Sequence, residues 1–173
     1  MSALDLEALR ATHADLDVQV SASPTSDPDS PEARMRVPGD HARTLLERLR
    51  GEADAPSVRL LDLTVVDRLD ASPAGFEVIY RLGSRVGEFA YRVHGFIQDS
   101  ADDNPSIGSV SALWPSALWL EREAFDLFGI GFRGHPELRP LLLGADLGAD
   151  ADLNGAPLRK SAGQDQLSSG AGP

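Results

Sequence analysis

A single glutamate within an otherwise apolar helical face constrains this chain more than any other feature. The segment Glu121–Ile130 packs four charges into six residues, with aromatic and aliphatic side chains between them. On a helical wheel of about 100° per residue, Glu121 falls inside the apolar arc, between Phe125 and Phe128. A carboxylate that faces a hydrophobic core must find a charge partner or several hydrogen-bond donors, because burial without them costs several kcal/mol. The sequence therefore predicts a helix with a polar interaction built into its buried face.

The loop that follows this helix supplies two arginines that could neutralise Glu121. We expect Glu121 to form a structural ion pair with Arg133 or Arg139, or to accept hydrogen bonds from loop amides. Either interaction would hold the Gly129–Arg139 loop against the helix.

The opposite side of the same helix carries charges and one tryptophan. Pro115 fits the first turn of the helix, and Gly129 fits the position just past its end. Tryptophan and arginine are the residues that most often anchor protein interfaces. Two interpretations stay open, a solvated helix face with one stray aromatic or a surface that contacts a partner. The residues on this side are Trp119, Arg122, Glu123 and Asp126.

Composition excludes several classes of protein. The 173 residues suffice for one domain with a real core, or at most two small ones. The formal net charge of −11 argues against binding to nucleic acid or to anionic lipid headgroups, because both attract clustered Lys and Arg. The sequence has no cysteine, which excludes disulfides, thiolate nucleophiles and cysteine-ligated iron–sulfur clusters. Any redox role must therefore use a cofactor held by a partner.

No segment has the pattern of a membrane span or a secretory signal. Residues Met1–Val20 carry charges throughout and lack the apolar stretch of a signal peptide. The longest uncharged segment, Asn104–Leu120, contains two prolines and is too short and polar to cross a bilayer. We expect a soluble protein whose membrane association is indirect.

Hydrophobic periodicity predicts an α+β fold, with a mostly antiparallel sheet and helices packed on it. Strands dominate the first part of the chain, and no regular βαβ alternation appears. The 58–66 run is expected to be buried on both faces or twisted across the sheet, and Gly83–Gly87 is expected to close a hairpin. Helices are predicted at residues 3–11 and 41–50, and strands at 18–20, 35–37, 58–66, 76–82, 89–93 and 107–112.

The composition changes near residue 144. We predict a single α+β domain over residues 1–143. Residues 144–173 are small and polar, and we expect an extended tail that is disordered at its end.

Catalytic interpretations find little support in the spacing of titratable residues. A lone His135 before proline is typical of a loop hydrogen-bonder, and His94 is expected on the sheet surface. Glu121 and Glu123 point to different sides of a helix, so they cannot share a substrate. The sequence contains no phosphate loop, dinucleotide fingerprint or nucleophile elbow. We therefore assign no catalytic, cofactor-binding or metal-ligating residue, and a metal-dependent hydrolase using His135 and Asp126 stays a distant alternative.

The segment Leu120–Leu142 closely resembles the signature of the thirty-kilodalton subunit, or C subunit, of respiratory complex I (proton-pumping NADH:quinone oxidoreductase). A looser resemblance extends over roughly residues 30 to 160. The family's tail motif has a histidine and an aspartate where this chain has Ala156 and Ser161, which leaves the docking of the tail open. The matching signature residues are Glu121-Arg122-Glu123, Asp126, Leu127-Phe128, Gly129-Ile130, Phe132, Gly134-His135-Pro136 and Leu138-Arg139.

This resemblance implies a peripheral protein on the cytoplasmic side of the cell membrane, without a cofactor of its own. FMN and the iron–sulfur clusters would lie in partner subunits. The chain would pack against the hydrogenase-like D subunit, near the B subunit that carries the terminal iron–sulfur cluster. Equivalent subunits of membrane-bound nickel–iron hydrogenases and of related coenzyme dehydrogenases are the alternative. The residues expected to contact partners are Trp119, Arg122, Glu123, Asp126, His135, Arg139 and Arg159.

Overall fold

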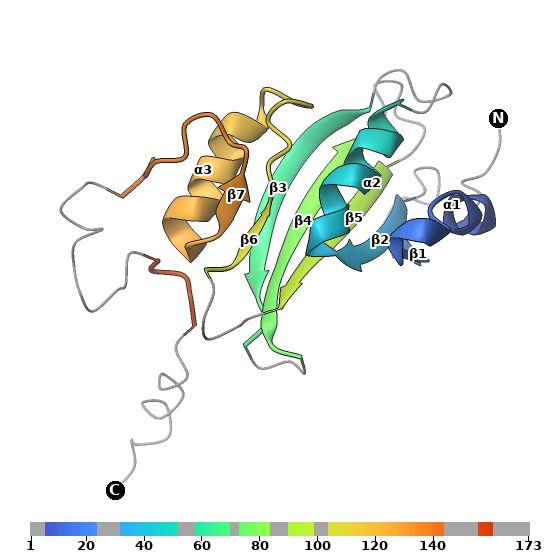
Figure 1. Ribbon diagram of the computed structural model, residues 1–173, viewed down its shortest axis with the longest axis horizontal. Coiled ribbons are helices and arrows are strands. Elements are labelled where there is room, and N and C mark those ends of the chain that lie inside the picture. The colour runs from blue at the N-terminus through green and yellow to red at the C-terminus, as the bar shows by residue number, and fades with distance from the viewer. Residues whose placement is uncertain are drawn as a thin grey trace, which may run out of the picture.

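A five-stranded sheet forms the centre of the molecule (Figure 1). The computed structural model describes residues 6–23, 32–51, 58–69, 73–83, 90–98, 104–143 and 156–160. In chain order its elements are α1 (Leu6–Thr12), the short 3-10 helix η1 (Ala14–Leu16), β1 (Gln19–Ser23), β2 (Glu32–Pro38), α2 (Gly39–Gly51), β3 (Arg59–Asp67), β4 (Gly75–Gly83), β5 (Ala90–Gln98), β6 (Ser106–Gly108), α3 (Ala117–Phe128) and β7 (Gly131–Arg133).

The strand pairing confirms a mostly antiparallel sheet with packed helices. The order is β1-β2-β5-β4-β3. Only the β2–β5 pairing in this sheet is parallel. The predicted hairpin partners, β4 and β5, pair antiparallel from Gly75 opposite Gln98 to Gly83 opposite Ala90. Residues 84–89, where the hairpin turn was predicted, lie outside the described part. Two short strands, β6 and β7, pair in parallel beside this sheet.

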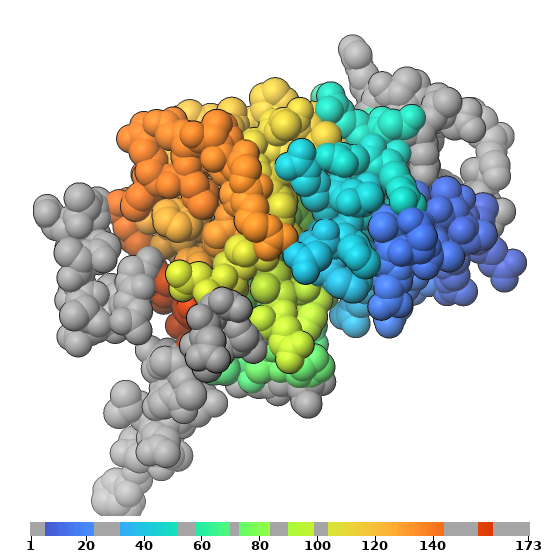
Figure 2. Space-filling view, viewed as in Figure 1, coloured from blue at the N-terminus to red at the C-terminus, as the bar shows by residue number. Residues whose placement is uncertain are grey.

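The hydrophobic core lies between one face of the sheet and the helices. Successive strand residues point to opposite faces, and the buried apolar side chains of β2, β4 and β5 occupy alternate positions, so they share one face of the sheet. Helix α2 lies in front of the sheet in Figure 1, and its residues Ala42, Leu45, Leu46 and Leu49 are fully buried. In Figure 2, α2 and residues 104–143 lie next to each other and cover much of the sheet face that points toward the viewer.

Strand β3 departs from the prediction that it is buried on both faces. Leu61, Asp62 and Thr64 are exposed, whereas Leu63 and Val65 are buried. Helix α3 covers one face of β3, so burial alternates along the strand. A bulge between Leu60 and Asp62 shifts the register against β4 and increases the local twist.

The remaining predictions concern element bounds and the tail. Both N-terminal helices occur within a few residues of their predicted positions, but β6 ends at Gly108 instead of residue 112. Residues 156–160, which the sequence assigned to the tail, lie against the body, since the Leu158 N–H donates to the Leu127 carbonyl at 3.0 Å. Residues 144–155 and 161–173 of the predicted tail lie outside the described part, as do residues 24–31. No helix in the described ranges combines the length and the apolarity that a membrane crossing requires.

We predict that Gly95→Ala destabilises the fold because α2 and β6 approach β5 closely there. An added Cβ would lie 2.8 Å from Ile107 Cδ1 and 3.0 Å from Ala42 Cβ. The expected loss in free energy of unfolding is about 1–3 kcal/mol, measured by urea denaturation. Gly51→Ala is the control, because a Cβ there meets no atom within 4 Å. Equal stability of both variants would show that the close approach is not required.

Candidate functional site

The residues at both ends of α3 define where the helix begins and ends. Gly129 adopts φ of 69°, and its N–H donates to the Phe125 carbonyl at 2.9 Å, as expected for a glycine that ends a helix. The helix begins at Ala117, after Ser116 at the N-cap. Pro115 therefore lies one residue before the cap instead of in the first turn, and its carbonyl accepts the Leu118 N–H at 3.2 Å.

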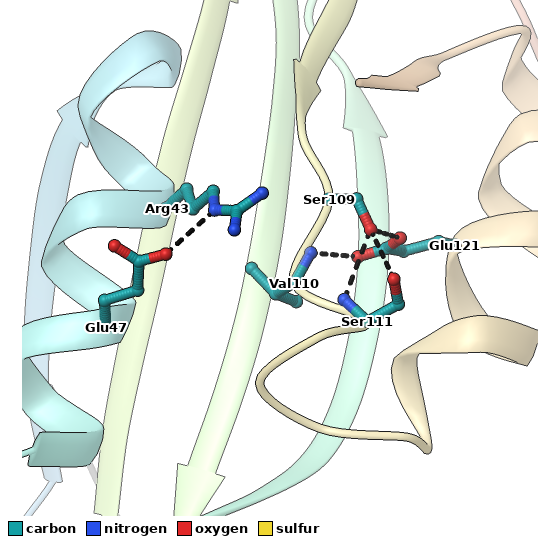
Figure 3. Close-up of polar contacts among 6 residues, drawn as sticks. All are labelled: Arg43, Glu47, Ser109, Val110, Ser111 and Glu121. Carbon is teal, nitrogen blue, oxygen red and sulfur yellow. Dashed lines mark hydrogen bonds and ion pairs between the residues drawn. The ribbon is translucent and has the colours of Figure 1, made fainter. Parts of the chain in front are cut away.

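The Glu121 carboxylate is fully buried, as its place in the apolar arc predicts. Its Oε1 accepts the Val110 N–H at 2.6 Å, and its Oε2 accepts the Ser109 hydroxyl at 2.6 Å (Figure 3). Burial raises the pKa of Glu121 above its usual value, although these two donors and the nearby His135 and Arg43 favour the ionised form. The carboxylate thus holds the loop at residues 109–111 against α3.

The predicted ion pair of Glu121 with Arg133 or Arg139 is wrong. Arg133 pairs with Asp40 at 2.7 Å, and Arg139 pairs with Glu137 at 2.7 Å. Pairing of β6 with β7 brings the 109–111 loop beside α3, so neutral donors satisfy the carboxylate. The alternative prediction, that Glu121 accepts a hydrogen bond from a loop amide, is confirmed by the Val110 N–H. That amide belongs to the loop before α3, however, and not to the Gly129–Arg139 loop after it.

Two further charges of α3 also hold a loop of the same chain. Arg122 and Asp126 are 6% and 3% exposed. Arg122 donates to the carbonyls of Arg139 at 3.0 Å and Pro140 at 2.9 Å. Oδ2 of Asp126 accepts three successive N–H groups, those of residues 141–143, at 2.9, 2.6 and 2.8 Å. Both residues were expected to contact a partner directly, which is wrong because they are buried within their own chain.

Exposed apolar side chains lie on α3 and on two segments hydrogen-bonded to it. Trp119 is 59% exposed, and its ring lies 5.2 Å from the Arg122 guanidinium carbon. Leu142 and Leu158 are 59% and 52% exposed, on segments hydrogen-bonded to α3. These three are among the five exposed large apolar side chains of the described part. We call Trp119, Glu123, Leu142 and Leu158 the α3 surface.

Three other residues were predicted to contact a partner. His135 and Arg139 lie in the segment after α3, and Arg159 lies in residues 156–160. His135 is half-buried, and its Nε2 lies 3.1 Å from the Leu118 carbonyl while its Nδ1 accepts the Glu137 N–H at 3.0 Å. The expectation that His135 is a loop hydrogen-bonder is confirmed. Arg139 is exposed, and Arg159 lies 5.0 Å from the Phe76 ring centroid. Contact of His135, Arg139 and Arg159 with a partner stays a prediction.

The residues of the hydrolase alternative are committed to structural hydrogen bonds. Both ring nitrogens of His135 face backbone groups, and Asp126 accepts the three amides described above. In the described ranges, no three His, Asp or Glu residues gather closely enough to hold a metal ion.

A second polar cluster, which the sequence did not reveal, lies on the other face of the sheet. His94 is 6% exposed, so its predicted surface position is wrong. Its Nδ1 lies 3.0 Å from Glu77 Oε1, and Glu77 also pairs with Arg68 at 2.9 Å and with Arg36 at 3.6 Å. Alternation places Glu77 and His94 on the same face, but only the β4–β5 register shows that they meet.

The surroundings of this cluster lower the pKa of both titratable groups. Burial opposes the ionisation of Glu77, but the hydrogen bond from Arg68 and the interaction with His94 outweigh it and lower the pKa. Burial also lowers the pKa of His94, with Arg34 and Arg36 acting in the same direction, although Glu77 opposes them. Neutral His94 then donates its Nδ1–H to ionised Glu77.

Sequence comparisons connect the chain to known proteins. A family model described as the 30 kDa subunit of respiratory-chain NADH dehydrogenase matches residues 35–166. The C subunit of the NADH-quinone oxidoreductase of Caulobacter vibrioides is 40% identical over 112 residues, 65% of this chain and 51% of that protein. The C subunit of Azorhizobium caulinodans is 39% identical over 129 residues, 75% of this chain and 56% of that protein. The chain thus spans about half the length of the curated relatives it matches.

Two solved structures have a similar fold. A trypsin-resistant fragment of Nqo5 superposes with a TM-score of 0.61 at 25% identity, covering 78% of this chain and all of the fragment. A chain of the membrane-bound sulfane sulfur reductase, an archaeal respiratory membrane complex, gives a TM-score of 0.62 and covers 94% of this chain and 89% of its own length. Its identity is 19%, so this second likeness concerns the fold alone.

We predict that Glu121→Gln is tolerated and Glu121→Ala is not. Glutamine keeps an acceptor for the Val110 N–H and avoids the cost of a buried charge, so the free energy of unfolding should change by less than about 1 kcal/mol. Alanine leaves buried donors unpaired and should lower it by about 1–3 kcal/mol. Denaturant unfolding at pH 7 measures both. A glutamine variant as unstable as the alanine variant would show that the charge itself is required.

We predict that stability falls as the pH drops below 6.5, through His94. Because its folded pKa lies below the ordinary value of 6.5, the unfolded chain binds more protons in this range and is favoured by acid. NMR titration of the imidazole protons, with the His94 signal identified by its loss in His94→Gln, should give a midpoint below 6.5. That variant should also lose less stability than the wild type between pH 7 and pH 5. A midpoint at or above 6.5 would contradict this.

Proposed function

Because the chain belongs to the family of the 30 kDa subunit of respiratory-chain NADH dehydrogenases, we propose that it is a scaffolding subunit of a proton-translocating NADH:quinone oxidoreductase. In this role it has no active site of its own. It helps to fix the subunit that forms the quinone site, so that electrons from NADH reach the quinone.

Its partners in this proposal are the hydrogenase-like D subunit and the B subunit, on the cytoplasmic side of the membrane. FMN and the iron–sulfur clusters belong to partner subunits. The lack of cysteine in these 173 residues supports this division, because iron–sulfur clusters are held mainly by cysteine thiolates.

The observation that carries the proposal is which side chains of α3 are buried and which are exposed. Its charges Glu121, Arg122 and Asp126 are buried and hold loops of the same chain. Outward, the α3 surface presents Trp119 and Leu142, both more than half exposed. Exposed apolar clusters of this kind mark protein interfaces, and a tryptophan on a fixed support is a common anchor of binding energy.

A related complex with a different electron donor is the second candidate. The equivalent subunit of a membrane-bound nickel–iron hydrogenase or of a coenzyme dehydrogenase would have the same scaffolding role. The fold shared with the sulfane sulfur reductase chain favours keeping this candidate. Identification of the electron-input subunit that co-purifies with the chain distinguishes the two.

We predict that Trp119→Asp lowers the amount of chain retained in the complex. An aspartate in place of this tryptophan would put an unpaired charge in the interface, and loss of such an anchor typically weakens binding by about 2 kcal/mol or more, roughly thirtyfold. The measurement is affinity purification of the tagged full-length chain from native membranes, with quantitative mass spectrometry of the co-purified subunits.

Thr44→Asp is the matched control. Thr44 is exposed on α2, away from the α3 surface, so the same new charge should leave retention unchanged. Both variants should unfold at the same denaturant concentration as the wild type within error. Full retention of Trp119→Asp would refute docking through this surface. A wild-type chain that co-purifies with no other subunit would refute the scaffolding role itself.

A further inference from the structure

The face of the sheet away from α2 and α3 carries a row of arginines. Residues directly opposite each other on paired strands share one face. Arg34 of β2 lies opposite Arg92 of β5, and Arg92 lies opposite Arg81 of β4. Three like charges therefore cross three adjacent strands, an arrangement that is destabilising unless anions neutralise it.

The chain neutralises this face incompletely. Glu32 pairs with Arg92 at 2.9 Å, and Glu77 is shared by Arg36 and Arg68. Arg34 and Arg81 have no ion pair within the described ranges, and the buried Nε of Arg34 has no hydrogen-bond partner there. We call the five residues Arg34, Arg36, Arg68, Arg81 and Arg92 the arginine face.

The arginine face is basic in an acidic protein. Four carboxylates lie on this face or line its cleft, those of Glu32, Glu77, Asp62 and Asp17, against five guanidinium groups. The whole chain carries a formal charge of −11. The helices α2 and α3 pack on the other face, and in the described part no helix lies over the arginines.

A cleft at one end of this face offers room for a side chain. It has a volume of about 380 Å³, and its lining includes Arg36, Arg68 and Phe96 together with the carboxylates of Asp17 and Glu77. Arg68 uses one of its five N–H donors on Glu77. Guanidinium groups with spare donors bind carboxylates in bidentate geometry.

We propose that the arginine face docks a carboxylate-rich segment of a partner subunit. This inference rests on the proposed place of the chain in a multi-subunit complex, and it adds a second contact surface, on the opposite face of the sheet from the α3 surface. A local cluster of aspartates and glutamates fits best, because the strong net negative charge of the chain repels an extended polyanion such as nucleic acid or an anionic bilayer.

Carbodiimide cross-linking tests this directly. The reagent joins a lysine amine to a carboxylate that it touches, and the sequence has a single lysine, Lys160. Arg81→Lys keeps the positive charge and introduces a second lysine into the chain, on the arginine face. In the intact complex purified from native membranes, we expect the peptide containing residue 81 to be cross-linked to an Asp or Glu of another subunit.

Arg48→Lys is the control. Arg48 lies on α2 and pairs with Asp15 of its own chain at 2.7 Å, so its cross-links should stay within the chain. A cross-link from residue 81 to Asp62, which lies opposite it on β3, is expected in either case. The absence of any cross-link from residue 81 to another subunit in the intact complex, or cross-links that only join two copies of the chain, would overturn the proposal.

Charge reversal gives a second readout. Arg81→Glu should lower retention of the chain in the complex by roughly tenfold at low salt, and the difference from wild type should shrink as salt screens the contact. Arg48→Glu, the same change of charge on α2, should have a smaller effect. Equal retention of Arg81→Glu and wild type at all salt concentrations would overturn the arginine-face contact, while loss of retention in Trp119→Asp would still support the scaffolding role.

Discussion

The buried carboxylate of Glu121 determines the arrangement of the C-terminal half of the described fold. A carboxyl group in a hydrophobic core is stable only if its oxygens find hydrogen-bond partners, and here Ser109 and Val110 provide them. Because the Val110 amide is committed to Glu121, β6 stops at Gly108 and the chain turns over α3. One local requirement, the satisfaction of a buried acceptor, thus ties β6, the loop after it and α3 into one unit.

Helix α3 differs from an ordinary amphipathic helix, in which charged side chains are exposed and large apolar side chains are buried. Three of its four charges, those of Glu121, Arg122 and Asp126, are buried against segments of its own chain, and its largest aromatic side chain is exposed. Arg122 binds carbonyls and Asp126 binds amides of the same 139–143 segment, so each type of backbone group meets a partner of opposite polarity. Trp119 rests on the guanidinium that this network holds in place. A rigid exposed aromatic loses little side-chain entropy on binding, which suits a docking role.

The two faces of the sheet serve different purposes. One is apolar and closed by α2 and α3, with Gly95 allowing the close approach of Ala42 and Ile107. The other alternates with it along each strand and carries the arginine face together with the buried Glu77–His94 pair. A subunit with contact surfaces on both sides of one sheet would connect neighbours that do not touch each other. Such an arrangement would extend the proposed scaffolding role, which itself rests on the α3 surface.

The sequence alone determined what depends on neighbours along the chain. Periodicity indicated the strands and α2, Gly129 marked the end of α3, and the 100° spacing per residue placed Glu121 in the core, because each of these follows from local backbone geometry. The tertiary structure decided which distant residues meet. Glu121 turned to Ser109 and Val110 instead of Arg133 or Arg139, since the pairing of β6 with β7 is a contact between distant segments. His94 became a buried partner of Glu77 for the same reason, because strand order and register determine which side chains share a neighbourhood.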